Sequence, residues 1–428
     1  MDRSGSLTTA AGSLRRRGLY YGWYVVLACN VVAFMTWGVG VFNQGVFLAY
    51  FSDTYGWSRF AISLGPTLFY VWGGVVGIAV GRLIDRRGPR PVLVAGAFLL
   101  GGGAVALGVI RLLWQVYPAF ILLATGYAFL HTVTLGAIVS RWFIRGRARA
   151  MAAATVGASF GGMVLAPLNA AILEHWGGAA GGITLGVLVL LAVLPVAFWV
   201  IKSGPEVMGL RPDGDAPSSA AGSPVAARDD EHHWTPAEAA RTRTFWVIVL
   251  SFHLVMIAQA GFLIHQVLFL QSEFGLVGAA TVVTVTGVMG VLGRLGFVAI
   301  GNRRPPRTLA SEAFLLQAAG LLISALGDGR AVLIAGSAIF GLTMGVTISL
   351  QPVLAAEAFG RRSFGRIYGP IYFAIQQGSA IGPLLIGLIA AWSGSYRPAL
   401  LLVTAGVLIA AGAIRLARGP HPPAPSPA

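Results

Sequence analysis

Long apolar segments recur from one end of the chain to the other, and each is long enough to cross a bilayer. A membrane-spanning helix needs ~20 consecutive, mostly apolar residues. The chain has 428 residues, of which 56% are hydrophobic and only 11% are charged. A soluble domain carries about 25% charged residues. These features predict an all-α integral membrane protein.

Twelve spans are predicted, in two groups of six. The first group forms an N-terminal bundle over 22–202 and the second a C-terminal bundle over 245–417. Between them, 203–244 contains "RPDGDAPSSAAGSPVAARDDEHHW", which is too polar to fold alone and predicts a cytoplasmic linker. Residues 1–21 are expected to be a cytoplasmic segment, and 418–428 a disordered cytoplasmic tail. The predicted spans are 22–48, 59–82, 90–111, 115–141, 147–173, 179–202, 245–271, 277–300, 308–326, 330–356, 363–391 and 396–417.

The distribution of basic residues predicts the orientation, because Lys and Arg concentrate in cytoplasmic loops. With the N-terminus inside, 25 of the 30 basic residues fall on the cytoplasmic side. The external loops hold four arginines, which are Arg59, Arg111, Arg330 and Arg397. The remaining basic residue, Arg294, is expected within the membrane. Both termini are therefore expected in the cytoplasm, and the protein is expected in the cell inner membrane.

Several other classes of protein are disfavoured. The net charge of +15 lies in short clusters between apolar segments, without the basic-aromatic interleaving that would indicate nucleic-acid binding. Cys29 is the only cysteine, so no disulfide or cysteine metal site is predicted. No phosphate-binding loop, Ser/His/Asp set or carboxylate pair lies at membrane depth, so an enzyme is not expected. No cofactor is expected, and the protein is expected to be a monomer.

One loop motif is specific. "GRLIDRRGPRP" at 81–91 follows the second span. It resembles the G-x-L-x-D-R-x-G-x-R pattern between helices two and three of the major facilitator superfamily. The resemblance implies a twelve-helix fold in two halves and a cytoplasmic gate. The residues that match the gate are Gly81, Asp85, Arg86, Gly88 and Arg90.

A weaker copy of this motif stands at the matching place in the second half. In "GRLGFVAIGNRRPPR", 293–307, Asn302 replaces the acid and Val298 replaces a glycine. The paired motifs and the division into six and six spans indicate duplicated halves, which in this family are related by an axis along the membrane normal. Any second gate is expected to be weaker.

Further segments narrow the resemblance to one branch. "YGWYVV" (21–26), "GPEVMGLRPDG" (204–214), "HWTPAEAARTRTFW" (233–246) and the stretch 357–396 resemble bacterial members of the monocarboxylate-transporter and oxalate/formate-exchanger branches. The resemblance covers nearly the whole chain. Its motifs mark the architecture and leave the substrate open.

Arg294 is the main candidate for a substrate-binding residue. A charge at mid-bilayer costs roughly 2.5–3.5 kcal/mol on insertion scales. Arg294 is expected roughly 9 Å from the inner end of its helix, at 1.5 Å per residue, so snorkelling to the cytoplasmic surface is an open alternative. Thr286, Gly287 and Gly290 share its helix face, which suits a cavity. The resembled carboxylate transporters have a substrate-binding arginine at this place, and a guanidinium grips a carboxylate with two bonds.

The absence of a second intramembrane cation favours a substrate with one carboxylate. Oxalate exchangers pair the helix-eight arginine with a lysine in helix eleven, where this chain has Gln376 and Gln377. Animal monocarboxylate carriers have an aspartate four residues before the arginine, where this chain has Gly290. The proton relay of those carriers is therefore in doubt here. Histidine is the remaining side chain that titrates near neutral pH. The candidates within spans are His131, His253 and His265, and for each of them a packing role is an equal alternative.

Other polar or aromatic residues within spans are expected to line a substrate site, and about half of them to contact it. With Arg294, the predicted substrate-binding residues are Asn43, Gln44, Tyr70, Tyr127, His131, His265, Tyr372, Gln376 and Gln377. The predicted function is secondary active transport of a small monocarboxylate such as lactate or pyruvate. Its partners are a proton or a counter-anion and the lipid bilayer. The alternatives are efflux of drugs or hydrophobic compounds, and exchange of dicarboxylate or formate anions.

Overall fold

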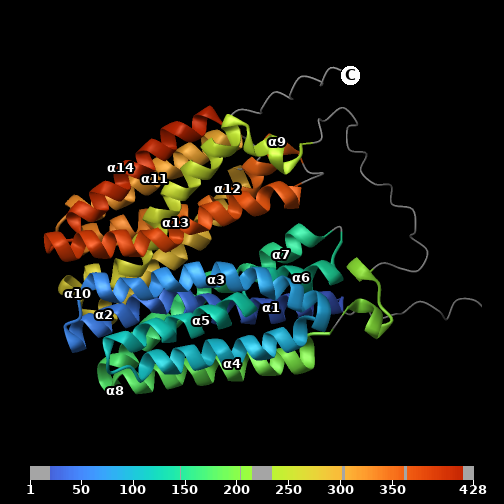
Figure 1. Ribbon diagram of the computed structural model, residues 1–428, viewed down its shortest axis with the longest axis horizontal. Helices are drawn as coiled ribbons and strands as arrows, with labels where there is room; N and C mark the ends of the chain where they lie inside the picture. The colour runs from blue at the N-terminus through green and yellow to red at the C-terminus, as the bar shows by residue number, and fades with distance from the viewer. Residues whose placement is uncertain are drawn as a thin grey trace, which may run out of the picture.

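The structure, a computed structural model, describes residues 20–144, 146–202, 204–214, 234–300, 304–360 and 364–417. The described chain is helical, and its helices form two bundles that lie side by side (Figure 1). The N-terminal bundle comprises α1 (Tyr21–Trp37), α2 (Asn43–Tyr55), α3 (Arg59–Arg87), α4 (Pro89–Gly108), α5 (Val116–Leu130), α6 (Thr132–Trp142), α7 (Arg147–Thr155) and α8 (Gly157–Pro195). The C-terminal bundle comprises α10 (Arg243–Ile300), α11 (Pro306–Leu326), α12 (Arg330–Phe359), α13 (Phe364–Ser393) and α14 (Arg397–Ala413).

The prediction of an all-α membrane protein is confirmed, and the twelve spans are accommodated. Ten described helical segments are long and apolar enough to cross a membrane, and two of them, 149–200 and 243–297, are long enough to cross twice. Each of these two is broken by a glycine. Gly177 (φ 78°, ψ −179°) divides α8, and Gly275 (φ 70°, ψ 175°) divides α10. Because an L side chain rarely adopts that conformation, glycine makes the tight reversal between two spans.

Two predicted boundaries differ from the structure. The first span continues through a π-helical turn, Gly38–Phe42, and ends at Tyr55 rather than near 48. The fourth predicted span, 115–141, is two helices, because His131 is extended (φ −80°, ψ −170°) between α5 and α6. The sequence contains no proline or glycine at that break, so periodicity alone did not indicate it.

The ends of the predicted linker are ordered. Short 3-10 turns form at Pro205–Met208 and Pro212–Gly214, and the helix α9 spans Pro236–Ala240. Thr235 caps α9, since its hydroxyl accepts from the Glu238 N–H while the Glu238 carboxylate accepts from the Thr235 N–H. The Asp213 carboxylate accepts from the N–H groups of Ile144 and Gly146, at 3.0 and 3.1 Å. Residues 1–19, 215–233 and 418–428, which include most of the predicted N-terminal segment, the middle of the linker and the tail, lie outside the described residues.

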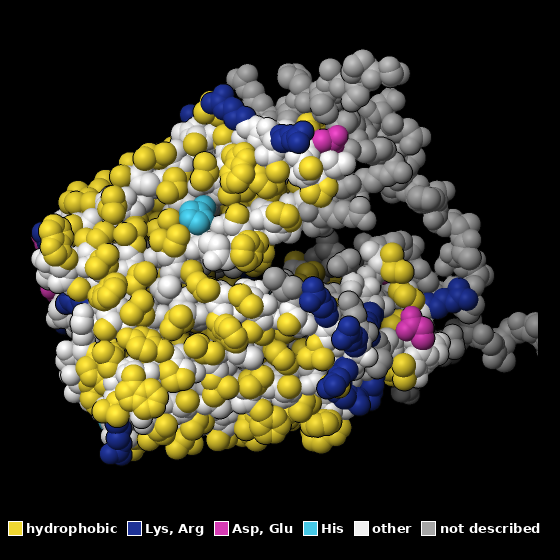
Figure 2. Space-filling model, viewed as in Figure 1, with side chains coloured by type: hydrophobic (Ala, Val, Ile, Leu, Met, Phe, Trp, Pro, Cys, Tyr) yellow, Lys and Arg dark blue, Asp and Glu magenta, His cyan; other side chains and the backbone are white. Residues whose placement is uncertain are grey.

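Charged side chains mark the two ends of the bundle. We call one end the basic end, where α3, α6 and α10 carry exposed or half-buried arginines, and we call the other the opposite end. The basic end includes Arg86, Arg87, Arg141, Arg149, Arg243 and Arg307. In Figure 2 hydrophobic side chains cover most of the visible face of both halves, and this face is hollowed between the halves toward the end where Lys and Arg gather. An apolar belt between two polar ends is the surface expected of a protein that crosses a bilayer.

Within the N-terminal half, α1 and α8 approach closely along small residues. A Cβ at Gly157 would overlap the backbone oxygen of Asn30, and one at Gly161 would overlap that of Phe34. The side-chain amide of Asn30 also joins α1 to α7, the helix before α8, by donating to the Ala153 carbonyl at 2.8 Å. Small residues at helix spacing allow this approach in lipid, where packing rather than hydrophobicity drives helix association.

We expect Gly161→Val to destabilise the folded protein by about 3 kcal/mol, because the obstructing Phe34 oxygen is backbone and cannot move aside. The measurement is thermal unfolding in detergent, together with the yield of monodisperse protein. Gly412→Val is the matched control, since a Cβ at Gly412 in α14 meets no atom within 4 Å. Equal melting temperatures for the two variants would contradict this account of the α1–α8 contact.

Candidate functional site: a central cavity between the halves

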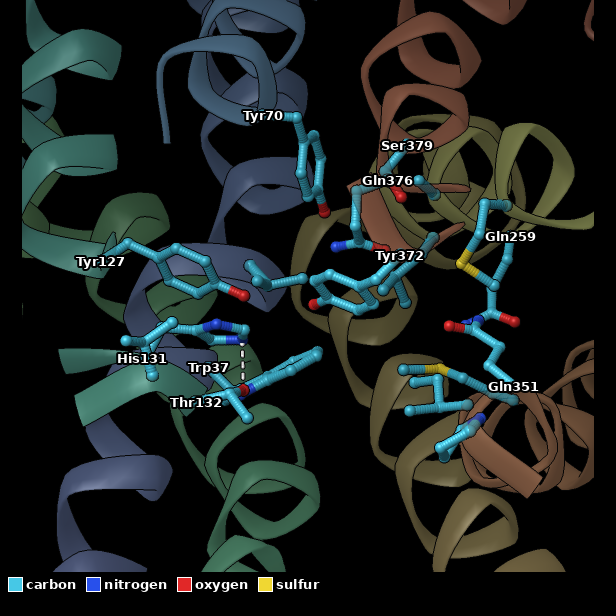
Figure 3. Close-up of a pocket in the computed structure, with 18 of the residues that line it drawn as sticks. Trp37, Tyr70, Tyr127, His131, Thr132, Gln259, Gln351, Tyr372, Gln376 and Ser379 are labelled. Carbon is cyan, nitrogen blue, oxygen red and sulfur yellow. Dashed lines mark hydrogen bonds between the residues drawn. The ribbon is translucent and has the colours of Figure 1, made fainter. Parts of the chain in front are cut away.

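A cavity of about 450 Å³ lies between the two halves (Figure 3). A second cavity of about 280 Å³ adjoins it and shares several lining residues, among them Tyr70, Tyr127 and Tyr372. No Asp or Glu lines either cavity among the residues that the structure describes. The side chains that line the larger cavity are those of Trp37, Val41, Tyr70, Tyr127, His131, Thr132, Val133, Met256, Gln259, Ala260, Leu263, Met344, Ile348, Gln351, Pro352, Tyr368, Tyr372, Gln376 and Ser379.

The N-terminal half supplies an aromatic wall. The rings of Tyr127 and His131 stack with centroids 4.5 Å apart, and the indole of Trp37 lies 5.5 Å from the His131 ring. The ring of Phe69 packs behind that of Tyr127, with centroids 4.8 Å apart. It meets the ring of Tyr70 edge-on, with centroids 5.3 Å apart. Figure 3 shows Trp37, Tyr127 and His131 together on one side of the cavity. This packing fixes the orientation of the rings.

The break between α5 and α6 occurs at this wall. His131 is extended, so Thr132 begins a new helix whose N-terminus is at the cavity. The Thr132 hydroxyl lies 3.2 Å from His131 Nε2. The first N–H groups of a helix have no acceptor within it, and its N-terminus carries partial positive charge. In transporters, such interrupted helices commonly form substrate sites.

The C-terminal half supplies a wall rich in amides. Gln259 from α10, Gln351 from α12 and Gln376 from α13 lie across the cavity from the aromatic wall, with Ser379 one turn from Gln376 (Figure 3). Gln259 is 5% exposed, and its Oε1 has no hydrogen-bond partner among the described residues. The two walls therefore differ in chemistry: one offers π faces and the other offers hydrogen bonds.

The structure brings together about half of the predicted substrate-binding residues. Tyr70, Tyr127, His131, Tyr372 and Gln376 line the larger cavity, and Gln377 lines the adjoining one. Sequence reasoning did not single out Trp37, Gln259, Gln351 or Ser379. Gln259 and Gln351 are amides isolated within apolar spans, and that isolation was the available signal.

Asn43 and Gln44 were predicted to line the site, and this is wrong in the observed conformation. Both are fully buried and line neither cavity. The Asn43 amide donates to the Gly38 carbonyl at 2.9 Å, and the Gln44 amide donates to the Gly40 carbonyl. These carbonyls belong to the π-helical turn, where the regular backbone pairing changes. The two side chains therefore satisfy backbone groups at the kink in the first span.

His265 also lies away from the cavity, at a contact between the halves. Its Nε2 is 2.9 Å from the Pro383 oxygen and 3.1 Å from Ser63 Oγ, and its Nδ1 is 3.3 Å from the Tyr396 hydroxyl. His253 lines neither cavity, and its Nδ1 is 2.8 Å from the Ala374 oxygen. Of the three candidate histidines, only His131 is at the cavity.

Arg294 lines neither cavity in this conformation, and its role in binding the substrate stays a prediction. Its side chain is half-buried and lies against α12 at Gly345, where a Cβ would overlap Arg294 Cγ and stand 2.9 Å from Nε. The neighbours of Gly345 on that helix, Met344 and Ile348, line the cavity. Arg294 therefore packs against α12 next to residues that line the larger cavity. It has no hydrogen bond or ion pair with any described residue.

Three contacts, which we call the closing contacts, join the halves toward the opposite end. Ser63 of α3 bonds to His265 of α10, the Thr67 hydroxyl donates to the Ala380 oxygen at 2.9 Å, and the Arg59 guanidinium lies 4.7 Å from the ring centroid of Tyr396. The cavity is therefore closed at the opposite end and open toward the basic end (Figure 2).

The predicted gate motif lies at the basic end. Arg90 donates to the carbonyls of Ala197, Phe198 and Ile201, at 3.0 to 3.1 Å, and so holds the end of the sixth span. Gly88 (φ 75°) makes the turn between α3 and α4, Gly81 lies in the last turns of α3, and Arg86 is exposed. The Asp85 side chain is outside the described residues. The bonds of Arg90 remain within the N-terminal half, so the gating role of the motif stays a prediction.

Two helical bundles, a central cavity made by both, closure at one end and an apolar outer surface define a membrane transport protein. Residues 26–377 match the family model of the Major Facilitator Superfamily, and the chain belongs to that family. It is 23% identical to monocarboxylate transporter 12 of Rattus norvegicus, over 89% of this chain and 82% of that one. It is 24% identical to the oxalate:formate antiporter of Oxalobacter formigenes, over 87% of this chain and 85% of that one.

A solved structure has the same fold. A bacterial homolog to the human lysosomal transporter Spinster, in an inward-facing and occupied conformation, aligns with a TM-score of 0.71 and 16% identity. The alignment covers 94% of this chain and 97% of that one. The family model and the two relatives together confirm the resemblance to the major facilitator superfamily and to its monocarboxylate and oxalate-like branch.

Proposed function

We propose that this protein is a secondary active transporter of monocarboxylates of the lactate and pyruvate type, coupled to protons, that works by alternating access. The observation that carries the proposal is Arg294, a half-buried intramembrane cation without a partner among the described residues. An unpaired guanidinium in a membrane is costly, so an anion is needed to offset it. The similarity to a monocarboxylate transporter and to an oxalate:formate antiporter supports the same class of substrate.

The electrostatics of the cavity support an anionic rather than a cationic solute. The described lining contains no carboxylate, while it contains His131 and the N-terminus of α6. A helix N-terminus favours a negative charge. Arg294 contacts α12 at Gly345, beside Met344, which lines the cavity. In this proposal Arg294 and the α6 terminus bind the carboxylate in different stages of the cycle.

His131 is the proposed proton carrier at the cavity, and His265 the proposed one at the closing contacts. A carboxylate bound beside His131 would favour the protonated imidazole, which links loading of the substrate to loading of the proton. In the same proposal the protein acts as a monomer in the cell inner membrane, with the basic end and both termini in the cytoplasm.

The test is uptake by the purified protein in liposomes. Labelled lactate, pyruvate, oxalate and formate are supplied with and without an inwardly directed proton gradient. We expect the gradient to stimulate uptake of lactate and pyruvate several-fold, and oxalate to be a poor substrate, because one unpaired cation balances one carboxylate. Acid-stimulated uptake that survives replacement of His131, His253 and His265 together by Gln would refute the histidine part of the proposal.

One observation favours a second candidate, the efflux of hydrophobic compounds. Most of the cavity lining is apolar or aromatic, with Met256, Leu263, Met344 and Ile348 among the side chains. The efflux hypothesis makes Arg294 a structural residue. Competition by uncharged hydrophobic compounds, with no effect of added carboxylates, would favour it over the first.

A further inference from the structure

The shape and chemistry of the cavity carry an inference about the size and type of the substrate, which rests on the proposed function. A three-carbon acid such as lactate has only six non-hydrogen atoms. Cavities of roughly 300–1,000 Å³ bury ligands of drug size. The larger cavity is about 450 Å³, and the adjoining one adds about 280 Å³. A three-carbon acid would leave most of this space to water.

The aromatic wall is suited to a flat ring. Trp37, Tyr127 and His131 form a continuous set of packed rings, with centroid separations of 4.5 Å and 5.5 Å. Their neighbours hold them in place, so they lose little conformational freedom when a ligand binds. Aromatic pairs gain energy beyond burial when a ring is stacked or edge-on. A short aliphatic acid has no group that uses this wall.

The amide wall is suited to a polar substituent. Gln259 Oε1 is a buried acceptor that lacks a donor in the described structure. Oε1 itself is not exposed to the cavity in this conformation, but Gln259 lines the cavity, so rotation of its amide brings Oε1 to a ligand that supplies an O–H or N–H group. The bond recovers the cost of a buried polar group without a partner. Gln351, Gln376 and Ser379 add further donors and acceptors on the same side (Figure 3).

The two walls belong to different halves of the protein. Trp37, Tyr127 and His131 come from the N-terminal half, while Gln259 and Gln376 come from the C-terminal half. A ligand that contacts both walls has different contacts when the halves rock, and only such a difference in affinity lets a ligand shift the conformational equilibrium. A substrate that spans the cavity therefore couples binding to the change of access.

We propose that the preferred substrate is an aromatic monocarboxylate with an O–H or N–H group on its ring system, of the hydroxyphenyl or indole type. Its ring stacks on Trp37 and Tyr127, and its polar ring substituent bonds to Gln259. The carboxylate occupies the side of the cavity at His131 and Thr132.

The test compares five probes with the purified protein in liposomes, each corrected for entry into protein-free liposomes. The probes are lactate, phenylacetate, 4-hydroxyphenylacetate, indole-3-acetate and phenylacetamide, the uncharged amide of phenylacetate. We expect 4-hydroxyphenylacetate and indole-3-acetate to bind at least tenfold more tightly than lactate. We expect the affinity of phenylacetate to lie between that of lactate and those of the two substituted acids. The measurement is the concentration that gives half-maximal uptake. We expect phenylacetamide not to be transported.

Variants separate the two walls. Gln259→Leu is expected to weaken the binding of 4-hydroxyphenylacetate about tenfold relative to the binding of phenylacetate. This is the effect of losing one buried hydrogen bond. Gln317→Leu is its control, because Gln317 is also buried, has no partner for either amide atom among the described residues and lines neither cavity. Trp37→Leu is expected to lower the preference for phenylacetate over lactate at least fivefold. Trp392→Leu is its control, since Trp392 is 88% exposed.

The outcomes distinguish this inference from the proposed function. Uptake of lactate with no uptake of, or competition by, any aromatic acid would overturn the inference and leave the proposed function standing. Equal transport of phenylacetate and phenylacetamide would overturn both, because the carboxylate would then play no part. The ranking of the five probes on the wild-type protein decides the matter even where a variant fails to fold.

Discussion

Replacing Arg294 with Gln is expected to reduce carboxylate uptake on the order of a hundredfold while leaving the folded protein intact. Removing one partner of a buried charge pair costs 2–5 kcal/mol or more. The guanidinium has no partner among the described residues, so the substrate itself is the proposed partner. The free protein loses no ion pair in this variant, and its thermal stability in detergent is expected to be unchanged or increased.

The measurement is proton-driven uptake by liposomes, with the affinity and the maximal rate determined separately. Arg294→Lys keeps the charge but lacks the planar fork, so uptake is expected to be intermediate. Arg243→Gln is the matched control, because Arg243 begins the same helix and is exposed at the basic end. If Arg294→Gln retains uptake within twofold of the wild type, Arg294 is not the counter-ion, and the hydrophobic-efflux hypothesis is favoured.

Replacing His265 with Leu is expected to raise the population of the state that is open at the opposite end about tenfold. His265 belongs to α10, and Ser63, whose hydroxyl lies 3.1 Å from its Nε2, belongs to α3 in the other half. The Ser63 hydroxyl donates to the Arg59 oxygen, so Oγ accepts from Nε2–H, which it shares with the Pro383 oxygen at 2.9 Å. Leu removes this bond and loosens Tyr396, on which Arg59 rests. The loss of one or two hydrogen bonds corresponds to about a tenfold shift.

The single cysteine provides a direct measurement. Cys29 is fully buried, and Cys29→Ala gives a background without cysteine. Ala260→Cys then places one thiol at the cavity on α10. A membrane-impermeant thiol reagent added only at the opposite end reacts in proportion to the population that is open there. His265→Leu is expected to increase that rate about tenfold.

The control for this variant is another histidine on the same helix. His253→Leu removes a bond to the Ala374 oxygen, which lies within the C-terminal half and does not join the two halves. The labelling rate is therefore expected to stay at the value of the background protein. Equal rates for the His253 and His265 variants would show that His265 does not hold the opposite end closed.

The fold was predictable to within a few residues at most boundaries. Apolar length alone indicated α4 and α11, and a strong charge asymmetry indicated which loops share a side. The break at His131 was not predictable, because neither residue type nor periodicity marks it. The order at α9 was also missed, although the Thr235 and Glu238 pair is a recognisable helix start.

The site was predictable in part. A tyrosine or histidine within a span is costly unless it faces a cavity or a partner, and this reasoning selected Tyr70, Tyr127 and His131, which line the cavity. The same reasoning selected Asn43 and Gln44, whose partners turned out to be carbonyls of their own helix. Polarity within a span indicates that a group must be satisfied. It does not indicate whether a ligand, a neighbouring helix or the backbone satisfies it.

The sequence by itself determined that this protein lies in a membrane, how many spans it has, that it divides into two halves and to which family it belongs. These properties follow from the length and spacing of apolar segments and from contiguous motifs. The tertiary structure alone decided which polar side chains meet. It placed Arg294 against Gly345 of α12, His265 against Ser63 across the two halves, and the aromatic wall opposite the amide wall. The physical reason is that contacts with distant segments fix the rotation of each helix about its axis. The sequence of a single span does not indicate those contacts.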